Sequence, residues 1–271
     1  MGAATSASPA TKKPNYNAST TSNPAPTSGS VYGSQDHISR AKNPSDVHGW
    51  LNNSMNTQLK LKFYYDYVSG QVYSEGDSPF HRTITQDVVE RFVDPLALPK
   101  TAAILDLGCG PGYFLDVMRD RGYTNTVGVT LSSDDAEQCR AKGHQVRRSD
   151  MNFLSDPDES IDMLFCRHSI EHSPFPYITL LEYNRVLKTN GRLYIEVPAP
   201  DCERGHEQNR NHYSIMGRTM WLELLKRTGF DITWYNYDFP VDYTDAEGNK
   251  TRFVENYYIF VCERRRPVDV K

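Results

Sequence analysis

The sequence predicts an α/β fold built on a doubly wound, mostly parallel β-sheet. Three features predict it: strand and helix patterns alternate from about residue 101, a glycine-rich turn follows the first strand of that series, and two aromatic strands joined by a polar turn close the chain. Parallel strands need crossover helices between them, so the alternation favours a Rossmann-like sheet. The terminal pair of strands is expected to form a hairpin that brings one antiparallel strand into this sheet.

The strand patterns define the expected sheet. Short apolar runs predict strands at Ala102–Gly108, Asn125–Leu131, His144–Asp150, Ile161–His168 and Arg192–Pro198. The two aromatic strands of the terminal hairpin are expected at Ile232–Phe239 and Glu255–Glu263.

Helices are expected in the segments between these strands. Apolar residues at helical spacing predict helices at Tyr113–Arg121, Ser133–Lys142 and Tyr177–Leu187, and an amphipathic helix at Arg218–Thr228 that Gly229 closes. In the third of these helices, Ile178, Leu181 and Val186 are expected to cover one face.

Composition divides the chain into four parts. These are a tail at 1–45, a lead-in at 46–100, a main domain at 101–266 and a short end at 267–271. The tail is rich in Ser, Thr, Ala and Pro, and it is expected to be disordered because it cannot bury enough apolar surface to offset its ordering entropy. Its opening residues fit the permissive pattern for myristoylation of Gly2. The lead-in is expected to contain a helix from Phe80 to Phe92.

Composition and charge exclude several classes of protein. A hydrophobic content of 38% suffices for a sizeable core, and no apolar run approaches the roughly 20 residues that span a bilayer. The net charge of −4 gives no general attraction for phosphate polymers, so a nucleic-acid partner is not expected. The five cysteines are widely spread, which predicts free thiols, a reducing compartment and a cytoplasmic location.

The clearest functional signal is the run Asp106-Leu107-Gly108-Cys109-Gly110-Pro111-Gly112, which follows the first strand. Glycines at such a junction let the backbone turn tightly and approach a ligand closely, and a helix begins immediately afterwards. The run therefore predicts a nucleotide-sized ligand at the carboxyl end of the strand. A dinucleotide cofactor is not expected, because its fingerprint needs a glycine where Tyr113 stands.

This run resembles the first motif of the class I S-adenosylmethionine-dependent methyltransferases, and the resemblance extends over roughly residues 100–263. It implies the fold of that family and S-adenosylmethionine as the methyl donor. In the family, the acidic residue and the glycine turn border the methionine and ribose parts of the cofactor. The resemblance places these roles on Asp106, Gly108, Cys109, Gly110 and Gly112.

The end of the second strand departs from the family pattern. The family usually has Asp or Glu there to accept both ribose hydroxyls, whereas this sequence has Thr130, followed by Leu131. A threonine hydroxyl is a single uncharged partner, so two outcomes are expected as alternatives: a lower affinity for the ribose, or assistance from Asp134 or Asp135. The run Gly-Val-Thr-Leu-Ser at residues 128–132 is similar to the cyclopropane-fatty-acid-synthase branch of the superfamily. In the lead-in, Tyr65-Asp66 and Tyr73-Ser74-Glu75-Gly76 are also similar to that branch.

The ends of the third and fourth strands carry further candidates. After the third strand, the resemblance implies that Asp150 accepts the adenine amino group and that Met151 covers the ring. After the fourth strand, it places the run from Cys166 to Pro174 between cofactor and acceptor, with Arg167 on the cofactor side.

Methyl transfer to a hydroxyl requires in-line alignment and removal of the hydroxyl proton. A histidine titrates near neutrality and suits the second task. Four histidines, His168, His172, His206 and His212, fall in loops expected at the carboxyl ends of strands. We expect His172 to be the base, with His168, Glu171 and His212 as the other catalytic candidates.

A polar loop from Pro200 to Ser214 is expected to form part of the acceptor pocket, because long loops in compact domains usually carry function. Its many hydrogen-bond donors favour a hydroxylated small molecule or a sugar as the acceptor. Asp201, Glu203 and His206 are side chains of kinds that bind cations, but their spacing is not diagnostic and no metal site is assigned.

The leading hypothesis is an S-adenosylmethionine-dependent methyltransferase that acts on a small-molecule or sugar hydroxyl. A lipid or carbon methyltransferase of the cyclopropane-synthase-like branch is the alternative within the same cofactor class. A non-catalytic scaffold that binds the cofactor is an alternative of a different class, since fold alone does not establish function. Methylation of nucleic-acid bases is disfavoured, because no Asn/Asp-Pro-Pro-Tyr run follows the fourth strand and no cysteine follows a proline.

Overall fold

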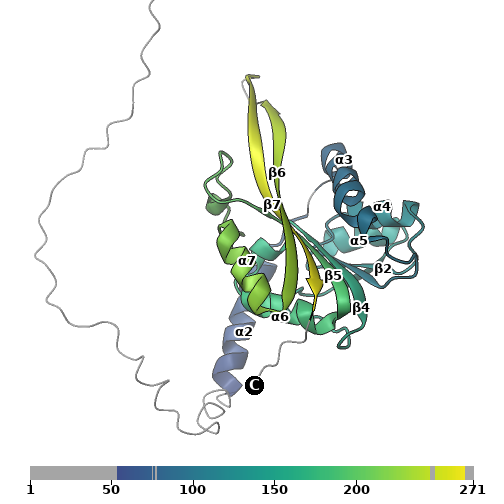
Figure 1. The fold of residues 1–271 in the computed structure, drawn as a ribbon. Helices are drawn as coiled ribbons and strands as arrows, with labels where there is room; N and C mark the ends of the chain where they lie inside the picture. Colours follow the sequence, from purple (N-terminus) through teal and green to yellow (C-terminus); the bar gives the residue numbers. More distant parts are fainter. Residues whose placement is uncertain (1–53, 75, 77, 245–247, 266–271) are drawn as a thin grey trace, which may run out of the picture. The chain divides into compact units, whose positions relative to one another are not determined.

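A seven-stranded β-sheet forms the centre of the fold (Figure 1). The computed structural model describes residues 54–74, 76, 78–244 and 248–265, so the tails predicted at 1–45 and 267–271 lie outside the described residues, as does Gly2. The strands are β1 (Ile104–Leu107), β2 (Thr126–Thr130), β3 (Gln145–Arg148), β4 (Ile161–Arg167), β5 (Leu187–Pro198), β6 (Phe230–Thr244) and β7 (Lys250–Arg264).

Strand directions confirm the predicted mixed sheet. The order across the sheet is β3-β2-β1-β4-β5-β7-β6. Strands β1 to β5 pair in parallel, and β7 pairs antiparallel with both β5 and β6. The terminal hairpin therefore brings one antiparallel strand into an otherwise parallel sheet. The strand order reverses at β1, between β2 and β4, and open α/β sheets bind ligands at such switch points.

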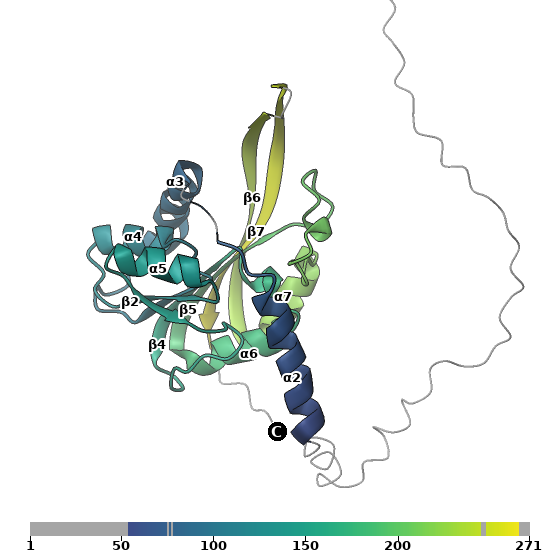
Figure 2. The ribbon, with the colours of Figure 1, turned by 180° about the vertical axis from the view of Figure 1, so that it is seen from behind.

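Helices cover both faces of the sheet (Figures 1 and 2). One face carries α3 (Pro79–Val88), α4 (Tyr113–Asp120) and α5 (Ser133–Ala141), and the other carries α6 (Pro176–Val186) and α7 (Arg218–Arg227). The helix α2 (Ser54–Ser69) precedes them, and the sheet belongs to the compact unit that begins at Lys62. Among the described residues, no helix combines the length and the apolar character needed to cross a membrane.

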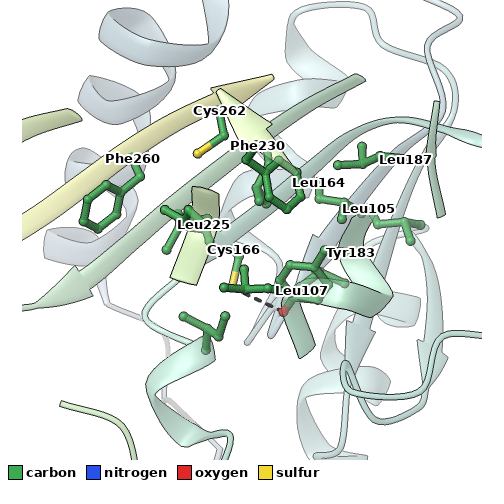
Figure 3. Packing of buried hydrophobic residues seen from close by; sticks show 14 of the residues in the cluster. Leu105, Leu107, Leu164, Cys166, Tyr183, Leu187, Leu225, Phe230, Phe260 and Cys262 are labelled. Carbon is green, nitrogen blue, oxygen red and sulfur yellow. Dashed lines mark hydrogen bonds between the residues drawn. The ribbon is translucent and has the colours of Figure 1, made fainter. Parts of the chain in front are cut away.

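Buried aromatic side chains join the helices to the sheet. On the face covered by α6, Tyr183 packs into the core with its hydroxyl 3.7 Å from Sγ of Cys166 (Figure 3). On the opposite face, Phe114 stacks on Phe165 with ring centroids 3.8 Å apart, and Phe165 stacks on Tyr194 at 4.8 Å. Burying one such side chain stabilises the fold by about 1.5–3 kcal/mol relative to exposing it, so this core fixes the strands that carry the loops at their ends.

The terminal hairpin is longer than the sequence predicts. Each of its strands has 15 residues, and pairing continues to Thr244 opposite Lys250. Figure 1 shows its outer part projecting past the body of the sheet. Pro240 and Asp242 interrupt the apolar pattern there, but pairing with the opposite strand keeps the backbone extended.

The helix predicted from Phe80 to Phe92 is shorter than expected. The α-helix ends at Val88 and continues as one π-helical turn, Val89–Val93, followed by a 3₁₀ turn at Asp94–Leu96. Strand β5 also begins at Leu187, ahead of the predicted Arg192, and a register shift interrupts its pairing with β4.

The buried face of α6 differs from the prediction. Ile178 is 49% exposed and does not cover the sheet, and Leu181 is half-buried, whereas Val186 is buried as predicted. The buried residues are Thr179, Leu180, Tyr183, Asn184 and Val186. Two of these are polar and are tolerated because they are hydrogen-bonded: the Thr179 hydroxyl donates to the Phe175 carbonyl, and the Asn184 amide donates to the Thr228 carbonyl. A pattern that counts only apolar residues misplaces this face.

Candidate active site

A cavity lies at the carboxyl ends of β1 to β4, where the strand order reverses. Its wall consists of the glycine turn, the residues that follow β2, β3 and β4, and side chains from the segment 64–85. The predicted site residues in this wall are Asp106, Gly108, Cys109, Gly110, Thr130, Leu131, Asp150, Met151, Arg167, His168 and His172. Those outside the wall are Gly112, Glu171 and His212.

The glycine turn presents bare backbone to the cavity. Gly108 and Gly110 have φ values of +76° and +49°, in the left-handed region that glycine adopts without strain. A Cβ atom at Gly108 would lie 2.0 Å from Oγ of Ser169, whereas one at Gly110 would meet no atom within 4 Å. Gly112 is the N-cap residue of α4, and a Cβ atom there would lie 3.0 Å from Sγ of Cys139, so glycine at this position permits close packing against Cys139.

Asp106 places a buried carboxylate at the cavity. The residue is 3% exposed, and among the described residues its Oδ2 has no hydrogen-bond partner. Burial raises the pKa of this carboxyl well above its ordinary value. Buried polar atoms normally have a partner, so the unpaired oxygen fits a ligand that donates a hydrogen bond.

The end of β2 brings Thr130 next to a second carboxylate. The Thr130 hydroxyl oxygen accepts a hydrogen bond from the backbone of Ser132 at 3.0 Å, and Oγ of Ser132 caps α5 by accepting from the backbone of Asp135. The side chain of Asp135 is buried in the cavity wall and accepts from the hydroxyl of Ser74. Asp134 is exposed and lies outside this wall. Of the two expected helpers of Thr130, only Asp135 therefore faces the cavity.

The end of β3 holds Asp150 in a hydrogen-bonded cluster. Its Oδ1 accepts from the backbone and side-chain nitrogens of Asn152 at 2.9 and 2.7 Å, and its Oδ2 accepts from the hydroxyl of Tyr64 at 3.1 Å. Burial raises the pKa of Asp150. Met151 lies beside it in the cavity wall.

The segment 64–85 lines the cavity, a role that its sequence did not predict. Its lining residues are Tyr64, Val68, Gln71, Val72, Tyr73, His81 and Thr85. The hydroxyl of Tyr113 anchors the segment, because it accepts from the backbone of Ser78 at 2.6 Å and donates to the carbonyl of Gly76 at 3.0 Å. The available signal was the run of tyrosines in the lead-in, which is equally typical of ordinary packing against a sheet.

Buried charges surround the end of β4. His168 Nε2 lies 3.0 Å from Oε1 of Glu196, and its Nδ1 lies 3.4 Å from Oε1 of Glu171. Burial alone would lower the pKa of His168, but the hydrogen bonds to these two carboxylates outweigh it and raise the pKa to about 9. His168 is therefore protonated at neutral pH and cannot act as a base there. Arg167 shares Glu196, with Nε 3.1 Å from Oε1.

The other three candidate histidines, His172, His206 and His212, lie close together. The rings of His172 and His212 have centroids 4.8 Å apart, and His206 stacks on His212 at 5.7 Å. The Nδ1 of His172 lies 2.9 Å from the Asn211 carbonyl, and the Nδ1 of His212 lies 2.9 Å from the His206 carbonyl. A carbonyl oxygen only accepts, so each Nδ1 carries a hydrogen, and in the neutral form of each ring Nε2 then carries the lone pair. Burial lowers the pKa of both His206 and His212.

The polar loop expected to form the acceptor pocket contributes two residues to the cavity, Asn211 and Tyr213. Asp201 and Glu203 are exposed, and the Asp201 backbone donates to a carboxylate oxygen of Glu207. Within the described ranges, Asp201, Glu203 and His206 do not bring their ligand atoms together, so the cation group considered from their order in the sequence does not form.

The chain belongs to the methyltransferase domain family, whose model matches residues 80–235. The match spans strands β1 to β5, the glycine turn and the cavity-lining residues that follow β2, β3 and β4. With the unpaired Asp106 oxygen and the open space at Gly110, it identifies the protein as a class I S-adenosylmethionine-dependent methyltransferase. Its methyl donor is S-adenosylmethionine.

Curated relatives of the chain include several small-molecule methyltransferases. Trans-aconitate 2-methyltransferase from Enterobacter sp. (strain 638) is 25% identical over 202 residues, which cover 62% of this chain and 80% of that protein. The 27-O-demethylrifamycin SV methyltransferase from Amycolatopsis mediterranei is 23% identical, with 59% of this chain and 65% of that protein covered. Ubiquinone biosynthesis O-methyltransferase from Hahella chejuensis is 28% identical, covering 50% of this chain and 57% of that protein.

Solved structures share the fold. The YcgJ protein from Bacillus subtilis superposes with a TM-score of 0.58 at 16% identity, covering 68% of this chain and 99% of that one. The cyclase SpnF superposes with a TM-score of 0.53 at 21% identity, covering 71% of this chain and 86% of that one. Because one of these neighbours is a cyclase, the fold by itself does not define the reaction.

Proposed function

We propose that the protein transfers the methyl group of S-adenosylmethionine to a hydroxyl oxygen of a small molecule, sugars included. The observation that carries this proposal is the set of polar side chains that line the cavity beyond those matched to the cofactor, namely Tyr73, His172, Asn211 and Tyr213. Such a lining offers hydrogen-bond donors and acceptors to the hydroxyls of an acceptor molecule, and a hydrocarbon chain would make no use of them. Two of the named relatives also transfer methyl groups in O-methylation, by their names.

The cofactor side of the cavity is proposed to follow the family pattern. Gly108, Cys109 and Gly110 provide the bare turn, with Asp106 beneath it as an acceptor of hydrogen bonds. At the end of β2, Thr130 and Asp135 are proposed to bind the ribose, with Leu131 as an apolar neighbour.

The adenine and methionine ends of the cofactor are proposed to lie at the next two strand ends. Asp150 and Met151 would hold the adenine ring, and Arg167 would border the cofactor after β4. When bound, the cofactor supplies a methyl group on a sulfonium, which is transferred by in-line displacement.

His172 is proposed to accept the hydroxyl proton. Its ring lies in the cavity wall, and the Asn211 carbonyl holds the Nδ1 hydrogen, so that the Nε2 lone pair is available. Tyr73 packs edge-on against this ring with centroids 6.4 Å apart, which restricts its rotation. His168 is proposed to act through its positive charge, because it is already protonated. Glu171 and His212 would position these two histidines from behind the wall.

A lipid or carbon methyltransferase remains the alternative within the same cofactor class. The run Thr130-Leu131-Ser132 and the tyrosines of the segment 64–73 support it. A cytoplasmic location is part of the leading proposal, and it is supported by the five cysteines, all of which are free.

The test combines cofactor binding with an acceptor screen. Calorimetric titration with S-adenosylhomocysteine measures the affinity of the cofactor site. Incubation with S-adenosylmethionine and panels of sugars, phenols, carboxylic acids and fatty acyl compounds is followed by mass spectrometry. A mass gain on hydroxylated acceptors alone supports the proposal. A gain on unsaturated acyl chains alone supports the lipid alternative, and tight cofactor binding without transfer to any acceptor supports the scaffold.

A further inference from the structure

Glu171, His172 and His212 form a cluster of metal-ligating side chains beside the cavity. A carboxylate oxygen of Glu171 and one ring nitrogen from each histidine lie within 4.8 Å of one another. The first two residues belong to the 3₁₀ turn η3 (Ile170–His172), and His212 belongs to the loop after β5. We infer that these three side chains bind one divalent transition-metal ion on the acceptor side of the cavity.

Backbone carbonyls orient both imidazoles for this role. Nδ1 of His172 donates to the Asn211 carbonyl and Nδ1 of His212 donates to the His206 carbonyl, each at 2.9 Å. Histidines that ligate metals usually donate their other ring hydrogen in this way, which fixes the tautomer and the ring direction. The Nε2 of His212 lies 3.2 Å from the amide of Asn209, an exposed residue, so an ion displaces one exposed hydrogen bond there.

Glu171 has a carboxylate oxygen that the described residues leave unpaired. The residue is 1% exposed, and its Oε2 has no hydrogen-bond partner among the described residues. Its other carboxylate oxygen lies 3.4 Å from Nδ1 of His168. An unpaired polar atom at this depth is unfavourable unless a ligand satisfies it, and a metal ion does so.

The two loops that carry the cluster are tied together at the cluster itself. The carbonyl of Glu171 accepts hydrogen bonds from the backbone nitrogens of Tyr213 and Ser214 at 2.8 and 3.0 Å. The Ser214 hydroxyl also donates to the carbonyl of Ser173 at 2.6 Å. These bonds hold residue 212 next to residues 171 and 172 without an ion, so binding requires small side-chain movements only.

The ligand set indicates the class of ion. Imidazole nitrogens suit zinc, iron, copper and nickel, whereas magnesium and calcium prefer oxygen ligands. Two histidines and one carboxylate are a zinc or iron(II) set that leaves positions open for water or a substrate oxygen. The three ligands therefore favour a first-row transition ion of the zinc type.

The inference rests on the proposed function in one respect, the identity of the molecule that meets the ion. His172 lines the cavity, so an ion on its Nε2 borders the space assigned to the acceptor. A hydroxyl bound to the ion loses its proton more readily, as metal-bound water does. The O–H bond breaks and the proton passes to water. The new O–CH₃ bond forms as the S–CH₃ bond breaks, and the electron pair of that bond stays on sulfur.

With the ion bound, the Nε2 lone pair of His172 lies on the metal. His172 can then accept the hydroxyl proton directly only in the metal-free protein. The two states are separable by experiment, because removal of the ion leaves the cofactor residues untouched.

The experiment uses the untagged full chain, freed of metal with a chelator. Co²⁺ is added while the visible absorption of the bound ion is followed, and Zn²⁺ is then added to displace it. The variant His212→Gln removes one ligand, and Glu203→Gln, which changes an exposed carboxylate of the same polar loop, is the matched control. Calorimetry with S-adenosylhomocysteine on each variant reports whether the fold and the cofactor site are intact.

The parent and Glu203→Gln should each bind one Co²⁺ per chain, and His212→Gln should bind at least about a hundredfold more weakly while retaining its cofactor affinity. Equal Co²⁺ binding by His212→Gln, or no binding by the parent, would overturn the inference. Failure of the proposed function looks different: Co²⁺ binding persists, but no hydroxylated acceptor gains a methyl group.

Discussion

The hydroxyl of Tyr64 donates a hydrogen bond to Oδ2 of Asp150 at 3.1 Å, although the two residues are 86 positions apart in the chain. Asn152 reinforces this contact, since its side-chain amide donates to both residues, at 2.9 and 2.7 Å. The segment before the sheet is thereby bonded to the strand end where the adenine ring is expected. Cofactor affinity should therefore depend on this contact.

The substitution Tyr64→Phe should weaken binding of S-adenosylhomocysteine about tenfold. It removes a hydrogen bond to a carboxylate, and such bonds contribute about 1.5–3 kcal/mol when well buried, less for a half-buried group such as this one. Calorimetric titration measures the change. Tyr177→Phe, an exposed tyrosine outside the cavity wall, serves as the control and should bind like the parent. Equal affinity in both variants would mean that the contact does not support cofactor binding.

Gly110→Arg should abolish detectable binding of S-adenosylhomocysteine. A side chain at this position meets no protein atom within 4 Å of its Cβ, so it extends from the cavity wall into the space proposed for the cofactor. Gly143→Arg is the matched control, because Gly143 also has a positive φ, +83°, and open space around it but lies outside the cavity. Both variants carry the same backbone strain of about 1–2 kcal/mol, so their melting temperatures should fall together while only one loses the ligand.

Asp135→Asn should lower the affinity for S-adenosylhomocysteine about tenfold or more. Thr130 offers no charge to the ribose. Of the two neighbouring carboxylates, Asp134 and Asp135, only the buried Asp135 lies in the cavity wall. A hydrogen bond to an ionised acceptor is worth about 1.5–3 kcal/mol, which corresponds to this loss. The neighbouring Asp134→Asn changes an exposed carboxylate outside the cavity and should leave the affinity unchanged. Identical calorimetric curves for the two variants would remove Asp135 from the ribose site.

Asp116 should make stability fall in acid. Burial raises the pKa of this carboxyl, but the hydrogen bond from His144 at 2.7 Å and the nearby Lys142 outweigh burial and lower it below 3.8. A depressed folded-state pKa stabilises the protein above the unfolded value, and this contribution is lost as the pH falls through the folded value. The substitution Asp116→Asn should lower the free energy of unfolding by about 2 kcal/mol near neutral pH.

Thermal melts between about pH 6 and pH 3 test this prediction, because the melting temperature of Asp116→Asn should change less steeply than that of the parent. Asp120→Asn, a change at a largely exposed carboxylate on the same helix, should retain the steepness of the parent. If the melting temperatures of the parent and both variants changed equally steeply with pH, Asp116 would not be the source of the acid sensitivity.

The fold could be predicted from the sequence because its signals are local. Alternating apolar runs mark β1 to β5, and the aromatic runs mark the terminal hairpin, so strand type and order along the chain need no knowledge of distant residues. The glycine turn is similarly local, since the positive φ of Gly108 and Gly110 is a property of the backbone at those positions. The buried face of α6 escaped prediction because Thr179 and Asn184 are buried through hydrogen bonds to other residues.

The candidate site was predictable only in part, for the same physical reason. Local sequence signals suffice for the methyltransferase fold, the glycine turn and the strand ends that carry Thr130, Asp150 and Arg167. The meeting of distant side chains, Tyr64 with Asp150 and His212 with Glu171 and His172, depends on how the whole chain folds. The charge of His168 depends on the tertiary structure as well, because two carboxylates from different segments converge on its ring. Such pairings follow from strand order and loop packing, and these depend on the whole chain rather than on neighbours in sequence.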